Sequence, residues 1–76
     1  MNYTIKLATK GCAKLFLEKT GNMYEVSDYN TLSNKISLRE YFERFDDALT
    51  RFLAICDEAK MTWEDIEHDP SDFCFD

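Results

Sequence analysis

The sequence predicts an α+β domain in which an antiparallel β-meander of three to four strands packs on one amphipathic helix. Short runs of alternating apolar and polar residues fill the first part of the chain, and glycines separate these runs. A helical stripe of apolar residues follows in the second part. With 76 residues, the chain has room for one domain.

The predicted strands come from three runs: residues 3–8 (YTIKLA), 12–19 (CAKLFLEK) and 23–29 (MYEVSDY). The first alternates Tyr3, Ile5 and Leu7 with Thr4, Lys6 and Ala8. The second has Ala13, Leu15 and Leu17 on one face and Cys12, Lys14, Phe16 and Glu18 on the other, and the third has Tyr24 and Val26 inward. The stretches TKG and TGN supply the turns, where Gly11 and Gly21 can adopt positive φ.

Residues 34–45 fit two interpretations. Ile36, Leu38 and Phe42 alternate with polar residues as a fourth strand would, over about residues 34–42. The same region also fits the beginning of a helix over 38–60, with Ser37-x-x-Glu40 as a capping box. That helix would be about 33 Å long, which is long for so small a domain. We therefore prefer the fourth strand and leave the longer helix as the alternative.

A helix is predicted over about residues 46–60, with Asp46 as its N-cap. Its apolar face, which should cover the sheet, comprises Ala48, Leu49, Phe52, Leu53, Cys56 and Ala59. Thr62-x-x-Asp65 reads as a second capping box. It predicts a short acidic C-terminal turn of helix that ends before Pro70.

Charge divides the chain at residue 61. Residues 1–61, the sheet-plus-helix body, hold nine acids and nine bases. The net charge of −6 therefore comes from residues 62–76 (TWEDIEHDPSDFCFD), the acidic segment of the same domain. It carries six carboxylates together with the aromatic residues Trp63, Phe73 and Phe75.

Sequence motifs give no support to an enzyme or to a cofactor. The phosphate-binding, dinucleotide-binding, zinc-protease and nucleophile-elbow patterns are missing from the sequence. The acids of residues 64–72 have no glycine among them, so a calcium loop is not expected. The single histidine, His68, stands between two acids that would keep it protonated, which does not suit a base that activates Cys74. Cys12, Cys56 and Cys74 are predicted to be free thiols, with Cys56 on the core face.

The acidic segment has two interpretations. Its aromatic residues can pack on the body and leave a solubilising end. Alternatively, it forms a docking surface in which aromatic anchors supply affinity and carboxylates attract a basic partner. We adopt the second as a hypothesis, with these partner-binding residues: Trp63, Glu64, Asp65, Glu67, Asp69, Asp72 and Phe73.

Size, element order and charge give the chain a family resemblance. YTIKLATKGCAKLFLEKTGN, then FDDALTRFLAICDEAK, then the acidic end TWEDIEHDPSDFCFD together resemble the small acidic inhibitor proteins of phages and mobile elements, of the anti-CRISPR type. The resemblance concerns general character over the whole chain and no signature residues. It implies a stoichiometric inhibitor, a monomer or a homodimer, that occupies a nucleic-acid or partner site on a larger basic protein such as a CRISPR effector. The balanced body departs from nucleic-acid mimics, which carry acids over most of one face.

Two other functions remain as alternatives. Lys6, Lys14 and Phe16, expected on one sheet face, could bind single-stranded nucleic acid, although the net negative charge opposes direct binding. An exposed sheet face could instead self-associate in an oligomerising structural domain. The N-terminal residues lack the long apolar core of a signal peptide, and no apolar run is long enough for a membrane span. We therefore expect a cytoplasmic protein without membrane contact.

Overall fold

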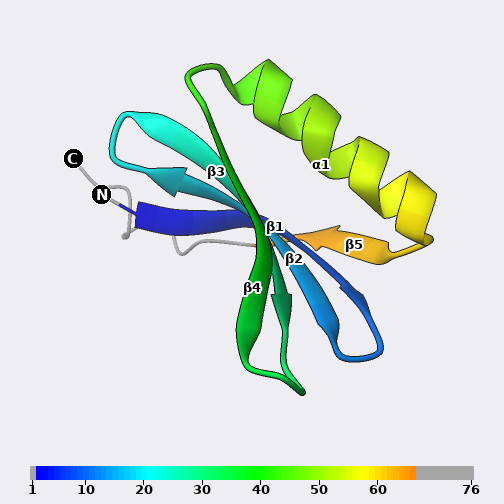
Figure 1. Cartoon of the computed structure of the whole chain (residues 1–76). Coiled ribbons are helices and arrows are strands. Elements are labelled where there is room, and N and C mark those ends of the chain that lie inside the picture. The colour runs from blue at the N-terminus through cyan, green and yellow to red at the C-terminus, as the bar shows by residue number, and fades with distance from the viewer. Residues whose placement is uncertain (1, 67–76) are drawn as a thin grey trace.

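The structure is a computed structural model that describes residues 2–66. This part comprises five antiparallel strands and one helix. The strands are β1 (Asn2–Lys10), β2 (Ala13–Thr20), β3 (Met23–Asn30), β4 (Lys35–Phe42) and β5 (Thr62–Asp65), and helix α1 spans Phe45–Ala59. The strand order is β4-β3-β2-β1-β5, and α1 lies across one face of the sheet (Figure 1). The predicted α+β class and β-meander are confirmed.

Two tight turns set the register of the meander. Gly11 and Gly21 each open a two-residue turn with a φ near +60°, which a side chain would make costly. The next connection contains Asn30, whose side-chain oxygen accepts hydrogen bonds from the backbone N–H groups of Leu32 and Ser33. Residues 35–42 then pair with β3. The fourth strand is therefore confirmed, and the alternative helix over 38–60 is wrong.

Helix α1 begins one residue before the predicted start. Arg44 is its N-cap, in an extended conformation and without a side-chain capping bond. The predicted cap at Asp46 is therefore wrong. Asp46 and Asp47 lie instead in the first turn, where their carboxylates interact favourably with the positive end of the helix dipole.

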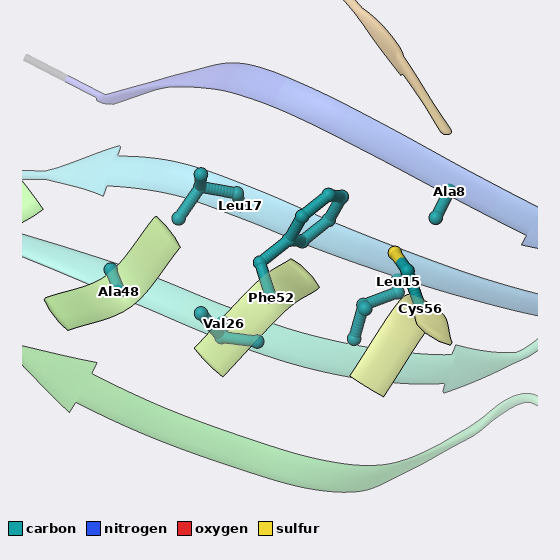
Figure 2. Packing of buried hydrophobic residues seen from close by; sticks show 7 residues of the cluster. All are labelled: Ala8, Leu15, Leu17, Val26, Ala48, Phe52 and Cys56. Carbon is teal, nitrogen blue, oxygen red and sulfur yellow. The ribbon is translucent and has the colours of Figure 1, made fainter. Parts of the chain in front are cut away.

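The core lies between α1 and the sheet. Figure 2 shows side chains of α1 packed among side chains of the strands, and the cluster comprises Ala8, Leu15, Leu17, Val26, Ala48, Phe52 and Cys56. Val26 was predicted to point inward, and this is confirmed; Leu15 and Leu17, which were predicted to share one face of their strand, are buried beside it. The predicted helix face is only partly right, because Leu53 and Ala59 are exposed whereas Ile55 packs against the cluster.

The chain reverses after α1 and adds a fifth strand. Lys60 adopts a left-handed conformation, and the N–H of Met61 donates to the carbonyl of Cys56 at 2.9 Å, as in a Schellman motif. Residues 62–65 then pair with β1, which has β2 on its other side. The predicted helical turn over these residues is wrong, since they complete the hydrogen bonding of β1. Pro70 lies outside the described residues.

A bulge in β1 changes which of its side chains face α1. Thr4 pairs with Glu18 and Lys6 pairs with Leu17, so Ile5 is an extra residue in β1. Beyond the bulge, Lys6 and Ala8 share the α1 side with the buried Leu17. The simple alternation predicted for residues 3–8 is therefore interrupted at Ile5.

Candidate protein-docking surface on helix α1 and strand β5

The side chain of Trp63 packs partly against the body of the protein and is partly exposed. Its partner in β1 is Ala8, which is buried beneath α1, so the indole lies on the α1 side of the sheet. The ring meets Phe52 edge-on, with centroids 6.5 Å apart, and the Lys6 ammonium lies 4.4 Å from the indole centroid. Trp63 nevertheless remains 41% exposed. Trp63 therefore has features of both interpretations of the acidic segment. Part of its ring packs on the body, and the rest is accessible to a partner.

A hollow of about 390 Å³ lies beside Trp63, between the C-terminal half of α1 and β5. We call it the α1–β5 hollow, and its lining residues are Leu53, Cys56, Asp57, Lys60, Met61 and Trp63. Leu53 is 36% exposed, whereas Cys56 is buried. The hollow thus combines exposed apolar surface with one acid and one base at its margin. Concave surfaces of this kind accept a side chain from a partner.

Negative charge gathers on the part of the molecule that forms this hollow. Residues 43–66 hold seven acids and three bases, a net charge of −4, whereas residues 2–42 hold four acids and six bases, a net charge of +2. The body has equal numbers of acids and bases, but their distribution is uneven: the meander is net positive, and the part that contains α1 is net negative. Arg51 pairs with Glu40 at 2.9 Å. Within residues 2–66, four exposed acids of α1 make no ion pair: Asp46, Asp47, Asp57 and Glu58.

The structure separates the predicted acids of β5. Asp65 lies on the same side as Trp63 and pairs with Lys6, so its charge is largely compensated. Glu64 lies opposite Leu7 and therefore points to the other side of the sheet. Trp63 and Glu64 were predicted to belong to one docking surface, whereas the register places them on opposite sides of the sheet. The other predicted binding residues lie outside the described part of the chain: Glu67, Asp69, Asp72 and Phe73.

Three residues of the candidate surface were missed in the sequence. Leu53 was assigned to the core, because it belongs to the apolar stripe of the helix. Asp57 was counted only among the nine acids of the charge-balanced body. Met61 was placed between the two predicted helical segments. Their relation to Trp63 depends on the chain reversal at Lys60, which the sequence does not signal because left-handed turns usually contain glycine or asparagine.

The predicted nucleic-acid face is not assembled as expected. Lys14 and Phe16 share the side of the sheet away from α1, because their neighbours Leu15 and Leu17 are buried under the helix. Lys6 lies on the α1 side, since the bulge at Ile5 reverses the alternation, and it is engaged by Asp65 and Trp63. The three residues therefore do not form one surface.

The thiols differ in accessibility, and this gives a testable prediction. Cys12 is exposed, whereas Cys56 is buried, and this burial raises the pKa of the Cys56 thiol. We expect a maleimide at pH 7.5 to modify Cys12 at least ~100-fold faster than Cys56, because the reagent needs both access and thiolate. Peptide mapping by mass spectrometry measures each site separately. The difference should disappear in denaturant, and equal rates in the native protein would contradict the buried position of Cys56.

Comparisons with protein-family models, curated proteins and solved structures found no match. Among the described residues, no helix is both long enough and apolar enough to cross a membrane. In the same part of the chain, no three His, Cys, Asp or Glu side chains form a group that could hold a metal ion.

Proposed function

We propose that this protein is a non-enzymatic inhibitor, of the anti-CRISPR or a related anti-defence type, that binds a basic nucleic-acid-binding site of a larger protein. The docking surface is the α1–β5 hollow together with the exposed acids of α1. The observation that carries the proposal is the position of Trp63, a half-exposed indole on the half of the molecule where negative charge is in excess.

Attraction and affinity come from different parts of this surface. The acids of α1, with Asp57 at the margin of the hollow, attract a basic partner and accelerate its encounter. Trp63 and Leu53 offer the apolar contact that lowers the dissociation rate. A lysine or arginine of the partner suits the hollow, because its aliphatic stem can contact Leu53 while its charged head group meets Asp57.

The predicted residues beyond the described part extend this proposal. Glu67, Asp69 and Asp72 would add negative charge, and Phe73 would supply a second anchor. Inhibition follows if the partner uses the same basic surface to hold DNA or RNA, because both ligands then compete for it. The proposed place of action is the cytoplasm of the cell that contains this partner.

Charge reversal on α1 tests the proposal. We expect Asp57→Lys combined with Glu58→Lys to weaken binding roughly tenfold to hundredfold at low salt, because two attractive charges become repulsive. The probes are purified CRISPR effector nucleases with their guide RNA omitted. Biolayer interferometry measures affinity, and a cleavage assay with restored guide RNA measures inhibition.

Glu64→Lys is the matched control. It reverses one acid next to Trp63, half of the charge change made on α1, but on the opposite side of the sheet. We expect Glu64→Lys to weaken binding less than threefold, because it lowers the net negative charge but changes no residue of the α1–β5 hollow. An equal loss of binding free energy per reversed charge in both variants would assign the effect to net charge alone. No binding by the wild-type protein to any nuclease of the panel would argue against this class of partner.

A further inference from the structure

The side of the sheet away from α1, which we call the open face, carries large apolar side chains that no described element covers. It presents five large side chains, none of which belongs to the residues that pack against the core: Leu7, Phe16, Tyr29, Ile36 and Tyr41. Ile36 is 45% and Tyr41 50% exposed. A sheet with one solvated side normally carries polar residues there. Because charged residues such as Lys14, Glu18 and Arg39 lie among these side chains, the open face suits a covering surface that offers both apolar contact and complementary charge.

Strand β2, at the centre of the sheet, gives the open face a charge pattern that is complementary to its own reverse. Phe16 lies midway between Lys14 and Glu18, each two residues away on the same side. Neither Lys14 nor Glu18 makes an ion pair within residues 2–66, although Thr4 donates a hydrogen bond to Glu18 at 2.9 Å. A positive charge, an aromatic ring and a negative charge thus follow one another along β2. Such a sequence is complementary to itself when reversed.

We propose that a second copy of this chain covers the open face and forms a two-fold symmetric dimer. The two-fold axis passes between the Phe16 rings and runs across the strands, so the two β2 strands stack in opposite directions. Lys14 then meets Glu18 of the second copy, and the reverse pair follows by symmetry. Sheets packed face to face are rotated by about 30°, a deviation that the long Lys14 side chain can span.

The neighbouring strands fit the same symmetry. On β4, Ile36 comes over Tyr41 of the second copy, and on β1 Leu7 comes over Leu7. Arg39, between Ile36 and Tyr41, would face its own symmetry mate. Its charge is already compensated by Glu25, at 3.0 Å on β3. Glu64, which lies beside Leu7 on β5, would also face its symmetry mate, and this pair of like charges lies at the edge of the interface, where solvent screens it.

The size of the open face is sufficient for such a dimer. Strands β1 to β4 have eight or nine residues and β5 has four, so with a spacing of about 4.8 Å the open face spans at most roughly 19 by 26 Å, or ~500 Å² per copy. The two copies together would bury about 1,000 Å², near the lower limit of specific protein–protein interfaces. The dimer would direct both α1–β5 hollows outward, so one particle could engage two partner molecules. It does not depend on the function proposed above.

Complementary charge variants of the full-length chain test the dimer. We expect sedimentation equilibrium to show a dimer for the wild-type protein at micromolar to millimolar concentrations. Lys14→Glu alone and Glu18→Lys alone should each weaken self-association roughly tenfold to hundredfold, because each variant places like charges opposite one another. An equimolar mixture of the two variants should recover the wild-type affinity as a heterodimer, and so should the double variant with both exchanges.

The mixture also controls for folding. Glu18→Lys loses the hydrogen bond from Thr4, but a misfolded variant could not restore association with Lys14→Glu. Wild-type protein that remains a monomer over the whole concentration range would overturn the proposal and would leave residues 67–76 or another protein as the cover. A dimer that persists unchanged in both single variants would overturn the proposed arrangement on the open face.

Discussion

Replacing Phe52 with alanine is expected to lower the free energy of unfolding by about 3–5 kcal/mol. Phe52 is the largest fully buried side chain, and it is the part of α1 that reaches the centre of the sheet. Its removal leaves a cavity among core residues of β1, β2, β3 and α1 and also takes away the edge contact with Trp63. Both losses act on the single interface that holds α1 to the sheet.

The loss is large relative to the total stability of so small a domain. A chain of 76 residues is expected to have a free energy of unfolding of about 4–11 kcal/mol. Phe52→Ala should therefore leave a protein that is partly unfolded at 37 °C. Chemical denaturation followed by circular dichroism at 222 nm gives the value. Leu32→Ala is the control, because Leu32 is 83% exposed in the β3–β4 connection and should change stability by less than ~0.5 kcal/mol. Equal losses in the two variants would contradict the described core.

Replacing Trp63 with alanine is expected to produce the largest loss of partner binding. If Trp63 anchors the partner in the α1–β5 hollow, the loss should be about 2–4 kcal/mol, or roughly 30-fold to 1,000-fold in affinity. Trp63 also contacts Phe52 and Lys6, so the substitution will cost some stability. Affinity must therefore be measured well below the midpoint of thermal unfolding, with the same nuclease that the wild-type protein binds.

Two further measurements separate docking from folding. Trp63→Phe keeps an aromatic ring against Phe52 and should retain most of the stability, while it loses part of the contact with the partner. Trp63 is also the single tryptophan of the chain, so its fluorescence reports directly on the hollow. We expect the emission to shift on binding because the indole loses water contact. A wild-type complex with unchanged emission, together with full affinity in Trp63→Ala, would place the interface elsewhere.

The local pattern of the sequence was reliable where periodicity and turn chemistry agreed. The two glycines mark both early turns, and the alternation of β2 and β3 identifies Leu15, Leu17 and Val26 as core residues. The apolar stripe of α1 likewise predicts Ala48, Phe52 and Cys56. These predictions succeed because regular elements repeat, so the side on which a residue lies follows from its position in the chain.

The candidate site was less predictable, because it depends on two irregular positions. The bulge at Ile5 contains no glycine that would mark it, yet it moves Lys6 to the α1 side, where it meets Trp63 and Asp65. The left-handed residue Lys60 also lacks the usual signal. Trp63 and the acidic character of the region were visible in the sequence, but their distribution over the two sides of the sheet was not.

The sequence by itself determined the β-meander, the amphipathic helix, part of the inward-facing residues of each, and the excess of negative charge near the C-terminal end. Only the tertiary structure decided that Thr62–Asp65 is a strand and that the α1–β5 hollow forms beside it. The physical reason is that a capping box and a short edge strand have similar local stability. The free edge of β1 provides backbone hydrogen bonds to just one of them, and that edge is formed by residues more than 50 positions away.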